Sequence, residues 1–299
     1  MLPKFRKSPI HHYPDGNMVL CVGHEHFRVH ASVLRASSSF FDGFFGGNSK
    51  ETVTHSVRCE HGDPKTDTGE TDGKVIATVQ LPGKNSKEVE MLLSTLYLHT
   101  EMEITWENVE PILKLADEYG FPRILAKCDQ LLRRDIGNKP LEVLILADRY
   151  RLPKAFNASS ALVLHDYAKI SRRPEYKQLS LETRVELQAV RLRYLDGIEE
   201  LSQQSAWANV MTNNPNCPTY HFQHFNNQRS TGSLTTLPLN QDFTGCQYCQ
   251  QPDCAKVKIN RLKDALGMSD EPVIVEDKKY YLYIELAEPI KEKKSPFSA

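Results

Sequence analysis

The sequence predicts an α+β fold that is predominantly helical. We expect a small sheet wrapped by helices, then helical hairpins, then a loop-rich C-terminal region. Three observations support this fold class. Two short strand patterns lead directly into helical patterns near residues 18–45. A helix pair over residues 112–132 is repeated over residues 143–163. Helical periodicity then stops near Gly197, where Asn, Gln, Thr and Pro become frequent.

The first expected elements are a strand pair and two short helices. Met18–Val22 is an apolar run broken by Gly23, and a second strand is expected at His26–Val29. The helical stretch that follows carries four aromatic rings on one face, which are Phe40, Phe41, Phe44 and Phe45. Such a face requires either a core or a partner.

The next part of the chain is expected to be a flexible insert followed by a strand and a helix. Residues 46–74 are rich in Gly, Thr, Ser, Asp and Lys and nearly lack apolar residues, so they cannot offset the entropy of ordering. Val75–Leu81 restores a strand, which a Pro-Gly pair ends. Asn85 followed by Glu88 resembles a helix-start box, and apolar residues continue at helical spacing to Tyr97.

Two further helices are expected after that. One runs from Thr105, as its N-cap, to Tyr119, where Gly120 closes the pattern. Pro111 removes a backbone donor inside this pattern, so we expect either a kink or a later helix start. The other helix is expected over Arg123–Arg134.

The repeat joins these helices to a second pair. Its seven identities are Leu113/Leu144, Leu115/Leu146, Ala116/Ala147, Asp117/Asp148, Tyr119/Tyr150, Pro122/Pro153 and Leu131/Leu162. Each copy is a helix ending in Leu-Ala-Asp-x-Tyr, a corner with a proline, and a second helix. Such units bury their apolar faces by stacking, although unrelated hairpins can also converge on similar corners. Each repeated Asp is expected to hydrogen-bond its own corner.

Three segments, taken together and in this order, resemble the BTB/POZ family. They are His30–Phe41, with its His-Ala-x-Val-Leu-x-Ala-x-Ser-x-Phe-Phe pattern, then Leu93–Tyr97, and then Ile104–Asp117. The resemblance covers about residues 17–136 and continues into a BACK-like helical extension. It implies a compact α/β cluster that often homodimerises through an amino-terminal helix and a strand edge.

The resemblance also divides the chain. The expected parts are a flexible N-terminal tail over residues 1–16, a BTB/POZ domain over 17–136 that contains the insert, a BACK-like helical extension over 137–197, and a C-terminal polar region over 198–299. Asn17 stands where the family often has Asp before its first strand, so a charged dimer pocket is not expected. Three prolines before Asn17 are hostile to the dimerising helix.

Functionally, the resemblance implies a protein–protein interaction module rather than an enzyme. The leading hypothesis is a substrate adaptor or scaffold for a cullin-3 ubiquitin ligase, with self-association as a homodimer. The residues expected to bind a partner are Phe44, Phe45, Ile124 and Leu131. The insert stands where cullin-binding members often have a hydrophobic-x-Glu motif. The alternatives are an oligomerising transcription-linked or signalling scaffold without a ubiquitin role, and a CxxC redox enzyme.

The C-terminal region carries a candidate zinc site. The candidate ligands, of which four would be used, are Cys217, His221, His224, Cys246, Cys249 and Cys254. The CxxC spacing of Cys246 and Cys249 places two thiolates on one turn, which can hold one edge of a tetrahedral Zn²⁺ site. The alternative is a set of unrelated reduced thiols. A redox role lacks the βαβ context of thioredoxin-like motifs. The chain then closes with a strand pair, Pro272–Glu276 and Tyr280–Leu286.

Composition excludes several other classes. The chain has 299 residues, of which 40% are hydrophobic and 25% charged, an ordinary globular balance. Its net charge of −1 and scattered basic residues argue against nucleic acid as a partner. An odd number of cysteines and the lack of any membrane-spanning apolar run favour an intracellular protein, in cytoplasm or nucleus or both. The sequence shows no phosphate-binding glycine loop, nucleophile elbow or HExxH motif.

The zinc hypothesis predicts a stoichiometric metal content. Purified full chain should contain about one zinc per copy by elemental analysis, because four of these thiolates and imidazoles fill one tetrahedral site. Replacing Cys246 and Cys249 by Ser should remove it. A zinc content near zero in the unsubstituted chain would leave only the reading as unrelated thiols.

Overall fold

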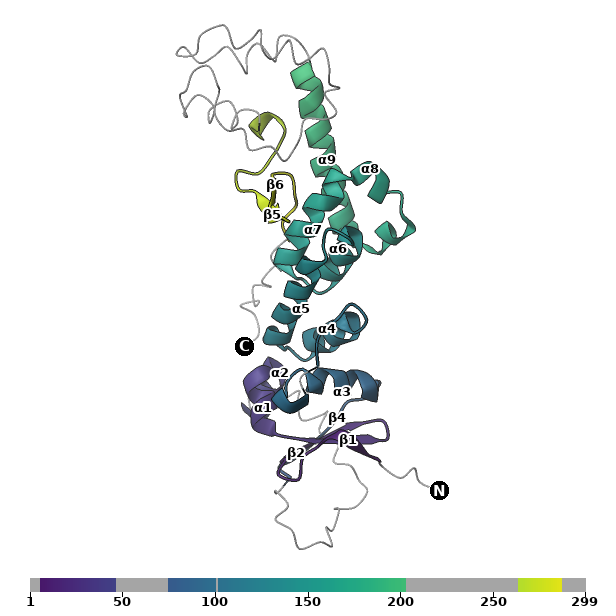
Figure 1. Cartoon of the computed structure of the whole chain (residues 1–299), viewed down its shortest axis with the longest axis vertical. Coiled ribbons are helices and arrows are strands. Elements are labelled where there is room, and N and C mark those ends of the chain that lie inside the picture. Colours follow the sequence, from purple (N-terminus) through teal and green to yellow (C-terminus); the bar gives the residue numbers. More distant parts are fainter. Residues whose placement is uncertain (1–5, 47–74, 101, 203–262, 287–299) are drawn as a thin grey trace, which may run out of the picture. The chain divides into compact units, whose positions relative to one another are not determined.

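The computed structural model describes residues 6–46, 75–100, 102–202 and 263–286 (Figure 1). The chain forms two compact units that meet in sequence between Leu131 and Leu132. The first unit combines a small mixed sheet with helices, and the second consists of helices and a short hairpin. The predicted α+β, predominantly helical fold is therefore confirmed.

The sheet of the first unit has four strands in the order β1-β3-β2-β4. The strands are β1 (Arg6–His12), β2 (Met18–Val22), β3 (Glu25–Val29) and β4 (Ala77–Gln80). β2 and β3 form the predicted antiparallel hairpin, while β1 pairs parallel with β3 and β4 parallel with β2. Both edge strands are thus added parallel to a central hairpin.

The strand β1 corrects the prediction of a flexible tail over residues 1–16. Ser8 and His11 are buried, with His11 fully inaccessible, so one side of the strand faces the interior. Pro9 lacks a backbone donor but is tolerated, because β1 pairs on one side only and edge strands accept proline. The prolines rule out a helix in this segment, but they are compatible with an edge strand.

The helices of the first unit lie between and after these strands. They are α1 (Ala31–Ser37), α2 (Ser39–Gly46), α3 (Ser86–Ser94), the 3₁₀ turn η2 (Leu98–Thr100), α4 (Val109–Glu118) and α5 (Pro122–Arg134). The predicted cap at Asn85 is confirmed, since its side chain accepts a hydrogen bond from the Lys87 N–H at 2.9 Å. The part of the predicted insert from residue 47 to residue 74 lies outside the described residues.

Helix α4 begins later than Thr105, which is not its N-cap. Asn108 is the N-cap, and its side chain accepts a hydrogen bond from the Thr105 N–H at 2.8 Å, closing a turn before the helix. Pro111 therefore falls in the first turn, where a backbone donor has no partner within the helix. Of the two outcomes expected from Pro111, the structure shows the later start.

The core of the first unit joins the sheet to α3 and α4, which pack against each other. Phe41 is buried, and its ring lies 6.1 Å from that of Tyr119 and 6.2 Å from that of Phe121. Gly120 between these two residues has a φ of +62°, and a Cβ there would clash with the Ser39 hydroxyl. The glycine therefore lets α2 approach the end of α4 closely.

The second unit contains the second copy of the repeat and a long helix. Its elements before residue 203 are α6 (Pro140–Arg149), α7 (Pro153–His165), α8 (Tyr167–Ile170), the 3₁₀ turn η3 (Pro174–Gln178) and α9 (Leu181–Ser202). α6 packs on α7, and α7 also contacts α9. Helix α9 extends beyond residue 197, where the helical extension was expected to end.

The hydrogen bonds of Asp148, at the end of α6, reach the start of α9 rather than the corner of its own helix pair, where the sequence predicts them. Its carboxylate accepts hydrogen bonds from the Ser180 N–H at 2.7 Å, the Ser180 hydroxyl at 3.1 Å and the Thr183 hydroxyl at 2.7 Å. The carboxylate therefore fixes the start of α9, where a negative charge also suits the helix dipole.

Residues 263–286 fold back onto the helices of the second unit. β5 (Val273–Val275) and β6 (Lys278–Tyr280) form an antiparallel hairpin. Its two turn residues, Glu276 and Asp277, both have positive φ, as a type I′ turn requires. The turn is thus one residue earlier than the sequence suggested, and the second strand ends at Tyr280, well before the predicted end.

The segment after the hairpin is held on α7 by hydrogen bonds between a side-chain hydroxyl and its backbone. The Ser160 hydroxyl on α7 accepts a hydrogen bond from the Ile284 N–H at 3.1 Å and lies 3.2 Å from the Ile284 carbonyl oxygen. Leu282 and Ile284 are almost fully buried. Part of the predicted polar C-terminal region, around Leu282 and Ile284, therefore belongs to a hydrophobic core.

The Asp148 contacts lead to a stability prediction. Asp148→Ala should lower the free energy of unfolding by about 1–2 kcal/mol, because three donors at the start of α9 lose their acceptor. Urea denaturation of the full chain measures this loss. Asp148→Asn keeps one acceptor oxygen and should lose clearly less. Equal losses for both variants would show that the acceptor is not what stabilises this junction.

Candidate partner-binding surface

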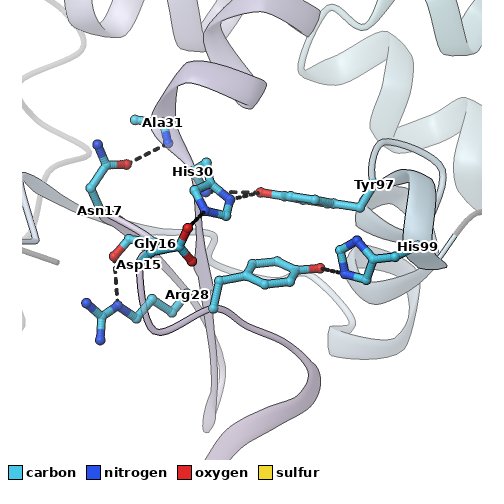
Figure 2. A network of polar contacts seen from close by, with 9 residues as sticks. Asp15, Gly16, Asn17, Arg28, His30, Ala31, Tyr97 and His99 are labelled. Atoms are coloured by element: carbon cyan, nitrogen blue, oxygen red, sulfur yellow. Dashed lines mark hydrogen bonds and ion pairs between the residues drawn. The ribbon is translucent and has the colours of Figure 1, made fainter. Parts of the chain in front are cut away.

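A polar network lies where β3 passes into α1 (Figure 2). The His30 N–H donates a hydrogen bond to the Tyr97 hydroxyl at 3.0 Å, and His30 Nδ1 lies 3.2 Å from the same oxygen. His30 Nε2 lies 3.2 Å from the Asp15 carboxylate, and this contact is the main cause that lowers the Asp15 pKa. Three segments distant in sequence thus meet at one imidazole.

Asn17 has a role in this network that the sequence did not indicate. Its side-chain oxygen accepts a hydrogen bond from the Ala31 N–H at 2.8 Å. His30, the N-cap residue of α1, makes no side-chain cap bond of its own. Asn17 therefore caps α1 from the loop that precedes β2, which an asparagine can do as well as an aspartate.

Tyr13 extends the network from β1 towards η2. Its hydroxyl lies 2.9 Å from His11 Nδ1 and 3.0 Å from His99 Nε2, and its ring is 4.7 Å from the Tyr97 ring. The other His11 nitrogen lies 2.9 Å from the Ser94 hydroxyl. Burial lowers the pKa of His11 to about 4 and raises the pKa of Tyr97 to about 12. His11 and Tyr97 are therefore both neutral near pH 7, so the bonds from His11 to Tyr13 and Ser94 are made by an uncharged imidazole.

A pocket of about 210 Å³ lies beside this network in the first unit. Its lining residues are Ser37, Thr95, Leu96, Tyr97, Arg123, Ile124 and Lys127. They come from the end of α1, the chain after α3 and the first turns of α5. A pocket of this size accepts a side chain or two but is smaller than most small-molecule sites.

The chemistry of the pocket is that of an apolar floor with a polar rim. Ile124 is 2% exposed and supplies apolar surface. Arg123 and Lys127 are exposed and stand one helical turn apart on the same face of α5. Two cations and three hydroxyl-bearing residues around apolar atoms suit a partner side chain that ends in a carboxylate.

The structure places the four predicted partner-binding residues differently. Ile124 lines the pocket, whereas Phe44, Phe45 and Leu131 are half-buried outside it. The Phe44 and Phe45 rings pack edge to face at 5.1 Å, and the Arg35 guanidinium lies 5.6 Å from the centre of the Phe45 ring. The Phe44 and Phe45 rings are thus only partly buried.

Sequence reasoning missed most of the pocket. Ser37, Thr95, Arg123 and Lys127 belong to three separate segments, and only folding brings them together. The one available signal was the i, i+4 spacing of Arg123 and Lys127 at the start of a helix.

The described residues contain no cluster of three or more His, Cys, Asp or Glu side chains that could hold a metal. The predicted zinc ligands lie between residues 203 and 262, outside the described residues. Within the described part, Cys21 and Cys128 are buried and form no disulfide, and burial raises the pKa of Cys128 to about 12. That thiol is therefore protonated and unsuited to redox chemistry. No helix among the described residues meets the length and hydropathy needed to cross a membrane.

The comparison with protein families agrees with this structure. Residues 13–136 match the model of the BTB/POZ domain, so this part of the chain is a BTB/POZ domain. BTB/POZ domains are interaction modules and not enzymes, and the predicted resemblance is confirmed.

The relatives are BTB and Kelch-like proteins. BTB and MATH domain-containing protein 36 of Caenorhabditis elegans is 28% identical over 174 residues, which are 58% of this chain and 47% of the relative. Kelch-like protein 21 of Danio rerio is 25% identical over 166 residues, 55% of this chain and 23% of the relative. Human Kelch-like protein 22 is 25% identical over 167 residues, which are 56% of this chain and 23% of the relative. The chain spans less than half the length of these relatives.

The buried histidine leads to a pH prediction. Because the pKa of His11 is about 4 in the folded chain and 6.5 when unfolded, the unfolded chain binds a proton first as the pH falls. The His11 contribution should therefore lower stability from about pH 6.5 down to pH 4, by at most about 1.4 kcal/mol per pH unit.

Urea denaturation at pH 7 and pH 5 measures this effect, with His11→Gln as the comparison. The variant cannot take up the proton, so its loss between the two pH values should be smaller than that of the unsubstituted chain. Equal losses in both proteins would mean that His11 does not titrate in this window.

Proposed function

We propose that this protein is a substrate adaptor or scaffold for a cullin-3 ubiquitin ligase. The observation that carries the proposal is a BTB/POZ domain followed directly by helical hairpins, with a polar-rimmed pocket on α5. The similarity to Kelch-like proteins supports an interaction role for this arrangement.

The proposed mechanism is proximity. The BTB/POZ domain would hold the ligase scaffold through the pocket and the Phe44 and Phe45 rings. Another part of the chain would hold a target. Linking the two partners on one chain raises their effective concentration. None of these steps requires a catalytic residue in this protein.

Self-association through the amino-terminal edge is a second part of the proposal. β1 lies at that edge, with Ile10 44% exposed and the outer side of the strand unpaired within the described sheet. Pro9 removes one backbone donor there. Any strand pairing between copies would therefore avoid Pro9 and use side chains around Ile10.

The competing function is an oligomerising scaffold in transcription or signalling without ubiquitin chemistry. It shares the fold and the self-association but needs no cullin-3 contact. Direct binding of purified cullin-3 to the full chain separates the two functions.

The pocket gives this test a specific form. The double substitution Arg123→Glu and Lys127→Glu should weaken binding of cullin-3 at least tenfold in calorimetry, because it reverses both charges at the rim of the proposed contact. Both side chains are exposed, so thermal unfolding of the BTB/POZ domain should change little.

Lys114→Glu is the matched control, since Lys114 is also exposed but lies on α4 and does not line the pocket. It should leave the affinity unchanged. No binding of cullin-3 to the unsubstituted chain would favour the scaffold function instead. Binding that is insensitive to the double substitution would place the contact outside the pocket.

A further inference from the structure

Helix α9 has two apolar faces, of which only one is used. The face turned to the rest of the second unit is buried, and its buried residues are Thr183, Leu187, Tyr194 and Gly197. On the opposite side, four large apolar side chains are exposed to 68%, 57%, 51% and 43%, and these are Leu181, Val185, Leu192 and Leu195. Half of the apolar surface of this helix therefore has no partner within the described residues.

The exposed face has the spacing of a coiled-coil seam. Its residues fall at i, i+4, i+11 and i+14, and Gln188 occupies the missing i+7 position. In heptad terms, Leu181, Gln188 and Leu195 are d positions, while Val185 and Leu192 are a positions. Val185 at a, with leucine at the d positions 181 and 195, is the combination that favours a two-stranded parallel coil, whereas Leu192 at the other a position carries no such preference. We call these five residues the α9 seam.

The charges beside the seam favour the same arrangement. Arg184 and Arg191 lie at g positions, and Glu182, Ala189 and Asp196 lie at e positions, so Arg184 has no charged partner in a parallel pair. In a parallel pair, g of one helix faces the following e of the other, so Arg191 meets Asp196 of the second copy. In an antiparallel pair, Arg191 would face Arg191 and Glu182 would face Asp196, and both contacts are repulsive.

We propose that the α9 seam binds the α9 seam of a second copy of this chain, parallel and in register. Gln188 then faces Gln188, and the two amides can hydrogen-bond each other, which penalises shifted registers. The seam covers about two heptads, fewer than the three or four that sustain a free coiled coil. It therefore adds to other contacts between copies rather than replacing them.

Site-specific cross-linking tests the orientation. Under mild oxidation, Gln188→Cys in the full chain should form a disulfide-linked dimer, because the two d positions face each other only in the parallel arrangement. Glu186→Cys is the matched control, since Glu186 is exposed on the same helix but lies at a b position, away from the seam. Arg191→Cys should instead form the cross-link in an antiparallel pair, in which Arg191 would face Arg191. Preferential linkage at 191, or equal linkage at 186 and 188, would overturn the proposal.

Charge reversal tests the same contact independently. Arg191→Glu and Asp196→Arg, each alone, should lower the affinity between copies about five- to tenfold in sedimentation velocity, because two symmetric ion pairs become repulsive. An equimolar mixture of the two variants should regain dimers, since the charges are then complementary between unlike copies. Unchanged thermal unfolding verifies the fold. Failure of the mixture to recover would show that the seam is covered by something other than a second copy.

Discussion

The hydrogen bonds that converge on the Tyr97 hydroxyl are the constraint on which the first unit depends. They connect the start of α1 to the chain that follows α3. The Tyr97 ring also lies 4.7 Å from the Tyr13 ring, and the Tyr13 hydroxyl contacts His11 on β1 and His99 in η2. Buried polar groups of this kind are costly when unpaired, so the network stabilises one arrangement of these segments. The same segments supply Ser37, Thr95 and Tyr97 to the pocket. The proposed partner-binding pocket is therefore built on segments that this network holds together.

The helical repeat illustrates how similar sequence can be used differently. Both copies keep the Leu-Ala-Asp-x-Tyr helix end and the proline corner. In the second copy, the Asp148 carboxylate accepts bonds from residues at the start of α9. A residue that seemed to serve its own corner thus sets where a 22-residue helix begins. That helix in turn carries the exposed α9 seam.

The two proposed surfaces suit an adaptor that acts as an assembly. The pocket on α5 offers cations and hydroxyls around an apolar floor, which selects a partner by charge as well as shape. The α9 seam is apolar with charges at its sides, which selects for orientation. One surface would recruit a different protein, and the other would bring copies together, so each bound partner would be presented more than once.

The sequence by itself determined the fold class, the central hairpin, most helices, the Asn85 cap and the BTB/POZ identity. The structural elements follow from local periodicity and capping, which depend on residues close in the chain, whereas the BTB/POZ identity follows from the resemblance of three short segments in a fixed order. It did not determine β1, because Arg6–His12 is a strand only through its pairing with β3. It placed Ile124 at the partner surface but not Arg123, Lys127, Ser37 or Thr95, since the pocket exists only where three distant segments meet. Nor could it show which face of α9 is covered, because both are apolar and only packing in three dimensions buries one of them.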